Sequence, residues 1–122
     1  MKKLITFILV ILSLKGFCQT DLTVSSIINK DLTYTFGNGG RLIRISSDST
    51  LFWRDLSGSK EANEKTKTLH IDEHTLMTSW YNSDKVFVTM LSDFSKLKVT
   101  GMVCWPDGKF YPIEGKIQIN YK

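Results

Sequence analysis

Short runs of alternating apolar and polar residues fill most of the chain after residue 31, and clusters of turn-forming residues separate them. An alternation with a period of two is typical of β-strands that bury one face and expose the other. The clearest example is TLMTSWY-NSDK-VFVTM at residues 75–90, where runs rich in β-branched and aromatic residues flank a polar cluster. Asn and Asp tolerate a left-handed backbone and bond their own main chain, so this stretch predicts a β-hairpin.

The same pattern predicts about eight strands, all joined by short connections. Their expected positions are residues 32–36, 41–46, 50–55, 65–71, 75–81, 86–91, 96–105 and 109–120. The polar stretch 56–64 is expected to be the longest loop and to form a rim. Short connections leave no room for crossover helices, so successive strands should pair antiparallel. Closure of such a meander gives an all-β, up-and-down barrel over residues 31–122, which holds its own side chains or one small ligand.

The segment before the barrel, residues 19–30, is polar apart from Val24, Ile27 and Ile28. This spacing predicts one or two helical turns, capped by Ser25 or Ser26, with a short strand as the alternative. The segment would cover one end of the barrel.

The first 18 residues have the pattern of a secretory signal peptide: a basic head, an apolar run at residues 4–14, and small residues at Gly16 and Cys18. The apolar run is shorter than the roughly 20 residues that span a bilayer, so we predict no transmembrane segment after processing. Cleavage before Gln19 would export the chain to the periplasm or outside the cell. Lipid attachment at Cys18 is the weaker alternative, because the bulky Phe17 precedes it.

Removal of the signal peptide changes the charge of the chain. The whole sequence has a net charge of +4, whereas residues 19–122 carry 13 basic and 12 acidic side chains. The basic residues are dispersed, so we predict no nucleic-acid partner. A length of 104 residues suits one domain, and Cys104 is the one cysteine left, which we expect to be a small buried hydrophobe in a strand.

Aromatic residues are the strongest candidates for a binding site. Four of them are placed to line a pocket in the barrel, and two polar residues could bind a head group at its mouth. The six candidate ligand-binding residues are Tyr34, Phe36, Trp53, Arg54, Trp80 and Asn82. The alternative is a barrel filled by these side chains, with no room for a ligand.

Metal and nucleophile chemistry receive little support from the sequence. His70, Asp72 and His74 alternate and could face one metal ion on a continuous strand, but Asp72 and His74 are expected to reverse the chain, which would separate the three side chains. Neither histidine lies in a nucleophile motif. We therefore predict no metal, no cofactor and no catalytic residues.

Four segments in order resemble the MoaF-like proteins: TYTFGNGG at 33–40, LFWRDLSG at 51–58, LMTSWYNSD at 76–84 and KVTGMVCWPDGKFYPIEG at 98–115. That family is related in fold to the bacterial phenolic acid decarboxylases, and both are small calycin barrels, similar in architecture to lipocalins. The resemblance covers nearly all of the chain after residue 18 and implies a calycin-like barrel.

The resemblance also implies which catalytic residues to look for. The decarboxylases carry an acid two residues after the tryptophan of the Ser-Trp hairpin, an arginine after the third strand, and tyrosines on the first hairpin. Here Asn82 replaces the acid, residues 62–64 contain no arginine, and Phe36 replaces the partner of Tyr34. An amide cannot deliver the proton, so this decarboxylation is not expected.

The sequence therefore predicts an exported, non-catalytic protein that binds a small, partly apolar or aromatic ligand. Two alternatives stay open. One is a divergent barrel enzyme with a lost or altered active site, and the other is an envelope interaction module with a filled barrel.

Overall fold

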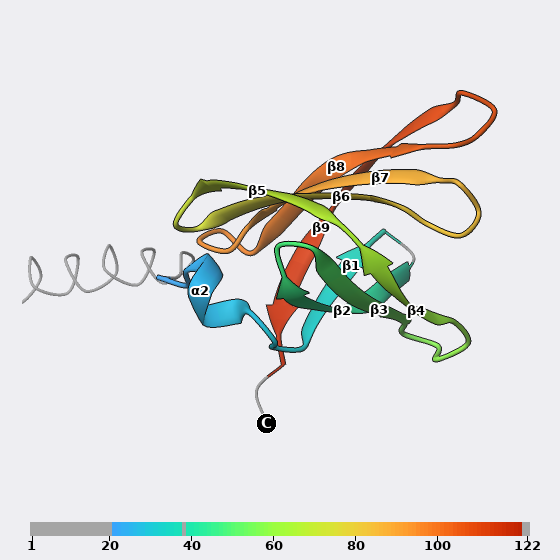
Figure 1. The fold of residues 1–122 in the computed structure, drawn as a ribbon. Coiled ribbons are helices and arrows are strands. Elements are labelled where there is room, and N and C mark those ends of the chain that lie inside the picture. The colour runs from blue at the N-terminus through green and yellow to red at the C-terminus, as the bar shows by residue number, and fades with distance from the viewer. Residues whose placement is uncertain (1–20, 38, 121–122) are drawn as a thin grey trace, which may run out of the picture.

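The computed structural model describes residues 21–37 and 39–120. The predicted signal peptide at residues 1–18 lies outside these residues. The described residues form one antiparallel sheet that curls into a nearly closed barrel (Figure 1), which confirms the predicted all-β barrel. A short helix, α2 (Val24–Ile27), precedes the strands, which are β1 (Leu32–Phe36), β2 (Gly39–Ser47), β3 (Thr50–Asp55), β4 (Glu61–Lys65), β5 (Lys67–Asp72), β6 (Thr75–Tyr81), β7 (Phe87–Asp93), β8 (Lys98–Cys104) and β9 (Phe110–Ile119).

The two edges of the sheet meet at a single residue. The strand order is β4-β3-β2-β1-β9-β8-β7-β6-β5, and the edge strands β4 and β5 are separated in the chain by Thr66 alone. The N–H of buried Thr66 donates to the carbonyl of Ser49 at 2.8 Å, which fixes this corner. β4 pairs with β3 and β5 with β6, so the barrel closes through a bent stretch of chain and not through a ladder between its edges.

The described residues contain nine strands, whereas the sequence pattern predicted eight. The extra strand, β4, lies in the stretch expected to be a loop and pairs with β3 from Arg54↔Glu61 to Thr50↔Lys65. Its sequence EANEK hides the alternation, because the side chains on its more buried face are the small Ala62 and the charged Glu64.

One end of the barrel is covered by α2 (Figure 1). Val24 and Ile27 are buried, as the spacing of apolar residues predicted, and the N–H of Val24 donates to the carbonyl of Glu73 in the β5–β6 turn at 2.7 Å. The helix is capped by Thr23 and not by either predicted serine; Ser26 Oγ accepts instead from the N–H of Thr23 at 3.1 Å.

The core fills the covered half of the barrel. Tyr34 of β1 crosses the interior, and its hydroxyl pairs with the hydroxyl of Ser92 on β7 at 2.8 Å. Both side chains are buried. The largest fully buried side chains around this pair are Phe94, Ile27, Leu32, Ile43, Ile45, Leu51, Leu76 and Val99.

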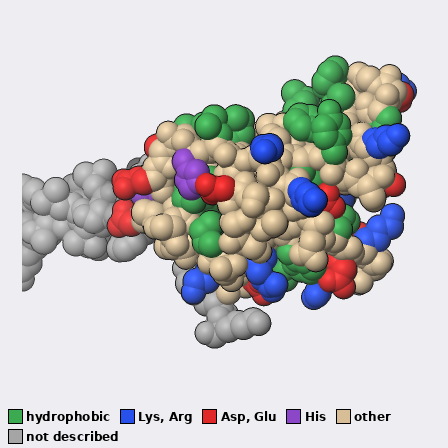
Figure 2. Space-filling model, viewed as in Figure 1, with side chains coloured by type: hydrophobic (Ala, Val, Ile, Leu, Met, Phe, Trp, Pro, Cys, Tyr) green, Lys and Arg blue, Asp and Glu red, His purple; other side chains and the backbone are tan. Residues whose placement is uncertain are grey.

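The outer face of β6 to β9 carries a row of cross-strand neighbours, namely Tyr81, Phe87, Cys104 and Phe110. Tyr81 and Phe110 are exposed, and the ring centroids of Tyr81 and Phe87 are 4.8 Å apart. Figure 2 shows apolar side chains gathered over this part of the surface. Cys104, which was expected to be a small buried hydrophobe in a strand, lies in β8 but is only half-buried in this outward row. Among the described residues, no helix has both the length and the apolar character needed to cross a bilayer.

Candidate functional site

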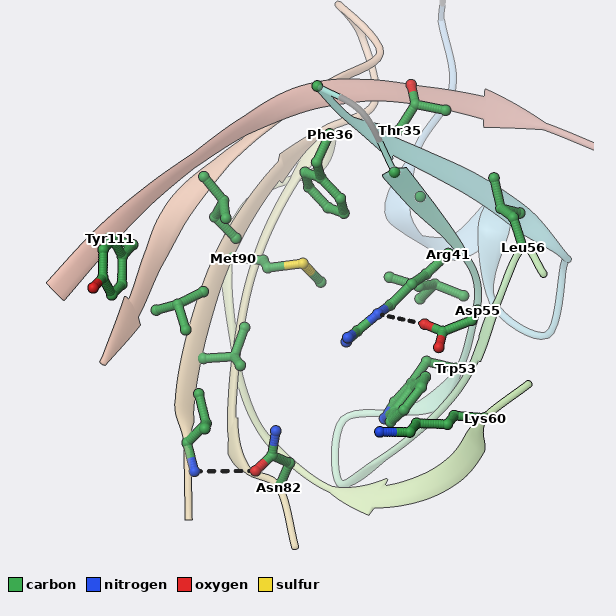
Figure 3. Close-up of a pocket in the computed structure, with 18 of the residues that line it drawn as sticks. Thr35, Phe36, Arg41, Trp53, Asp55, Leu56, Lys60, Asn82, Met90 and Tyr111 are labelled. Carbon is green, nitrogen blue, oxygen red and sulfur yellow. Dashed lines mark hydrogen bonds and ion pairs between the residues drawn. The ribbon is translucent and has the colours of Figure 1, made fainter. Parts of the chain in front are cut away.

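A cavity of about 1020 Å³ opens at the end of the barrel opposite α2. The connections β1–β2, β3–β4, β6–β7 and β8–β9 meet at this end, because successive antiparallel strands reverse there. Figure 3 shows side chains from both walls pointing into the space. The cavity is lined by Thr35, Phe36, Gly37, Gly39, Gly40, Arg41, Ile43, Trp53, Asp55, Leu56, Ser57, Lys60, Trp80, Asn82, Asp84, Val86, Val88, Met90, Val103, Trp105, Tyr111 and Ile113.

The floor of the cavity is apolar. It is made by inward-facing side chains of β2, β3 and β6 to β9, which alternate with outward-facing ones as the pleat of each strand requires. Those side chains are Ile43, Trp53, Trp80, Val88, Met90, Val103 and Ile113. At the lip, Trp105 and Tyr111 form an edge-to-face pair with ring centroids 6.5 Å apart. The floor and lip together can enclose the apolar body of a ligand.

An ion pair stands on the wall formed by β2 and β3. Arg41 Nε lies 3.3 Å from Asp55 Oδ1, and the guanidinium lies 4.3 Å from the centroid of the Trp53 ring. A cation over an aromatic face is attracted by the ring quadrupole, so Trp53 and Asp55 together hold Arg41 in place. Figure 3 shows the guanidinium directed into the cavity.

The Trp53 ring also presents an unusual polar atom. Its Nε1 is buried and has no hydrogen-bond partner among the described residues. A buried donor without an acceptor costs about 1–3 kcal/mol, so such groups are uncommon in folded proteins. Figure 3 shows this nitrogen turned toward the cavity, on the same wall as Lys60.

Asn82 lies across the cavity from this wall, at the end of β6. Its Oδ1 accepts from the N–H groups of Asp84 and Val86, both at 3.0 Å, which builds the β6–β7 turn. Because the oxygen is committed to the turn, the Nδ2 group is the part that Figure 3 shows facing the cavity. The turn that the sequence predicted here thus depends on Asn82 itself.

The structure brings four of the six candidate ligand-binding residues together. Phe36, Trp53, Trp80 and Asn82 line the cavity, and their contact with a ligand stays a prediction. Tyr34 lies beneath the cavity as a fully buried core residue. Burial raises the pKa of its phenol far above the ordinary value, against the smaller opposing effect of the hydrogen bond to Ser92.

Arg54 does not lie in the cavity. It points out of β3, where its Nη2 is 3.6 Å from Glu61 Oε2 and its guanidinium lies over the outward Phe52 ring. Neighbouring residues of a strand face opposite sides, so Arg54 could not share a face with Trp53. The arginine in the cavity is Arg41, which the pattern could have identified, because a two-residue turn after Phe36 places Arg41 opposite the inward Tyr34.

The histidines lie far from the cavity, near α2. His70 Nε2 is 2.8 Å from Asp48 Oδ1, and His74 Nδ1 is 2.7 Å from the carbonyl oxygen of Leu22. The hydrogen bond to the Leu22 carbonyl is the main cause that raises the pKa of His74; burial opposes it, and the neighbouring carboxylates of Glu73 and Asp72 add to the rise. Among residues 21–37 and 39–120, no three His, Cys, Asp or Glu side chains are placed to share a metal ion.

The fold and the cavity together define a small antiparallel barrel with an apolar lumen and a polar, open mouth. The family model described as MoaF-like matches residues 28–118, which begin directly after α2 and cover β1 to β8 and all of β9 except its last residue. The chain therefore belongs to the MoaF-like family, as its motifs indicated.

Comparison with solved structures adds information on the fold alone. A crystal structure from Burkholderia vietnamiensis, described as that of a "putative beta-lactamase", matches with a TM-score of 0.68 and 11% sequence identity. The match covers 77% of this chain and 95% of that chain. No curated protein matches the sequence.

Proposed function

We propose that this protein is exported and binds one small, partly apolar ligand in the cavity at the open end of its barrel, without chemical conversion. The observation that carries the proposal is the cavity itself, whose volume of about 1020 Å³ is not filled by the surrounding side chains. Ligand pockets of roughly 300–1,000 Å³ with an apolar lining and a few polar groups are the usual size for small molecules.

The unfilled lumen argues against the alternative of a barrel packed with its own side chains. The alternative of a divergent enzyme stays open, because Asp55, Lys60 and Asp84 are titratable groups in the cavity wall. It lacks the acid of the related decarboxylases, however, since Asn82 occupies that position and uses its oxygen in the turn.

Ligand binding in the lumen can be tested by a substitution that reduces the volume of the lumen. Val88 is buried and lines the cavity, whereas Leu91, on the same strand, faces outward and is exposed. Val88→Phe should weaken binding of the neutral dye N-phenyl-1-naphthylamine by about tenfold or more, because added volume in a confined space displaces the ligand. Leu91→Phe, which also introduces a phenylalanine, should leave the affinity within about twofold of wild type.

Binding is measured by dye fluorescence and by quenching of Trp53 and Trp80, with circular dichroism to confirm that both variants fold. Equal affinity of the two variants would place the dye outside the lumen. A panel of aromatic acids, fatty acids and dyes that leaves tryptophan fluorescence unmoved would remove the proposal altogether.

A further inference from the structure

Three polar groups that face the cavity from the β2–β4 wall, those of Arg41, Lys60 and Trp53, are hydrogen-bond donors. Figure 3 shows the Arg41 guanidinium, the Lys60 amine and the Trp53 ring nitrogen directed into the space, and the Asn82 Nδ2 group facing them from the other wall. None of these four groups can accept a hydrogen bond in the form shown. The carboxylate on the same wall, Asp55, is engaged by Arg41.

The arrangement leaves donors unsatisfied. Trp53 is 9% exposed, and its Nε1 has no hydrogen-bond partner within the described residues. Arg41 uses its Nε for Asp55 and stacks on Trp53, and its Nη groups have no hydrogen-bond partner in the described part of the chain. Lys60 pairs with no described carboxylate. An acceptor supplied from outside would therefore find donors without a hydrogen-bond partner on Arg41 and Lys60, on the same wall as the unpaired Trp53 nitrogen.

The Arg41 guanidinium is also preorganised for binding an acceptor. Its plane is fixed by the Trp53 ring at 4.3 Å and by the carboxylate of Asp55 at 3.3 Å, so little side-chain freedom remains to be lost on binding. Arginine in this setting matches the geometry of a carboxylate or a similar oxyanion.

The carboxylate of Asp84 indicates how an anionic ligand would be oriented in the cavity. Asp84 is exposed in the β6–β7 turn and is the other carboxylate in the cavity lining. An anionic group would be repelled from that side and attracted to the β2–β4 wall, with the apolar body of the ligand lying against the floor.

We propose that the ligand is an organic anion, whose carboxylate or similar oxyanion is bound by Arg41, Lys60 and the Trp53 ring nitrogen while its apolar body fills the lumen. This inference rests on the proposed ligand binding and adds the chemical class of the ligand.

The experiment uses two dyes that differ in a single charged group. 1-Anilinonaphthalene-8-sulfonate carries a sulfonate, and N-phenyl-1-naphthylamine is the same ring system without it. In Lys60→Met and in Arg41→Met, the affinity for the sulfonate dye should fall about tenfold, as for loss of a charge-assisted hydrogen bond, while the affinity for the neutral dye stays within about twofold. The matched control is Arg54→Met, which removes a cation from the outer face of the same wall and should change neither affinity.

A second measurement tests the carboxylate directly. 2-Naphthoate should displace the sulfonate dye from the wild-type protein at a concentration about tenfold lower than its neutral analogue 2-naphthalenemethanol, and this preference should disappear in Lys60→Met.

The outcomes separate this inference from the proposed function. Equal losses for both dyes, or a sulfonate affinity that survives both substitutions, would overturn the anion site while leaving ligand binding intact. Failure of the neutral dye to respond to Val88→Phe would instead remove the lumen as the binding site. A loss of sulfonate binding in Arg54→Met as large as in Lys60→Met would reduce the effect to general surface charge and overturn the inference as well.

Discussion

Trp53 and Arg54 are neighbours in the sequence but belong to different environments. Trp53 faces the lumen, whereas Arg54 lies outside the barrel beside Glu61. The alternation of a strand requires this separation, and it could have been applied to the sequence. The participation of Lys60 could not, because the path of the residues between β3 and β4 depends on a strand that the pattern does not reveal.

At the residue scale, we expect the hydrogen bond between the Tyr34 and Ser92 hydroxyls to contribute measurably to the stability of the fold. Tyr34→Phe removes the hydroxyl that pairs with Ser92 at 2.8 Å and leaves the buried Ser92 hydroxyl without that partner. We expect a loss of about 1–2 kcal/mol in the free energy of unfolding, measured by urea denaturation. A double-mutant cycle with Ser92→Ala should assign most of this loss to the pair, and additive effects would contradict the assignment.

The buried phenol also predicts how stability depends on pH. Burial raises the pKa of Tyr34 in the folded state, so above the ordinary tyrosine pKa the unfolded chain releases a proton that the folded chain keeps. The contribution is fully present below about pH 10 and is lost as the pH rises further, at about 1.4 kcal/mol per pH unit. The free energy of unfolding, measured by urea denaturation between about pH 9 and 11.5, should fall with this slope above about pH 10 in wild type and Ser92→Ala, and less steeply in Tyr34→Phe. Equal slopes in all three proteins would exclude the effect.

At the scale of elements, the sequence predicts most strands because their apolar residues fall on one face. Two strands were predicted with their observed bounds. Residues 50–55 are β3, and residues 75–81, the first strand of the hairpin predicted at 75–90, are β6. β4 was missed because pairing with β3 holds it in place, and none of its side chains is a large apolar residue. Its position thus depends on tertiary structure that local pattern does not record.

At Gly101, β8 approaches the backbone of β7 too closely to leave room for a side chain. A Cβ on Gly101 would collide with the backbone of Thr89 on β7, and a backbone carbonyl cannot rotate aside as a flexible side chain would. Gly101→Ala should therefore lower the free energy of unfolding by about 2–3 kcal/mol, measured in urea. Gly39→Ala is the control, because nothing lies within 4 Å of its added Cβ, and it should stay within about 0.5 kcal/mol of wild type. Comparable losses in the two variants would show that the close approach of β7 and β8 is not the cause.

At the scale of the whole molecule, the barrel divides into a covered half and an open half. The covered half holds the Tyr34–Ser92 pair and the core beneath α2, and the open half holds the polar groups that the connections bring together. The class of fold could be predicted from the sequence, because short connections between amphipathic strands allow few other topologies. The existence of the cavity could not, because the same aromatic residues could have filled a narrower barrel.

Because the Tyr34 hydroxyl lies in the covered half, outside the cavity, we expect that an acid at position 82 does not create a decarboxylase. Asn82→Glu should give no turnover of a hydroxycinnamic acid, because no arginine lies at residues 62–64 and the Tyr34 hydroxyl is bonded to Ser92 below the cavity. Asn82→Asp is the matched variant, since it keeps an oxygen that can accept from the turn. Turnover is followed by the change in ultraviolet absorbance of the substrate, and measurable activity in either variant would show that the cavity supplies the missing groups.

The corner at Thr66 has a further consequence, for association with other chains. Because the barrel closes by a bend in the chain, β4 and β5 each have one side without a strand partner among the described residues, and such edges can recruit another strand. The outward side chains there include Glu61, Lys65 and Lys67, all charged and exposed. Charges on edge strands disfavour addition of a second chain, so the place where this barrel is open is also the place where its sequence opposes aggregation.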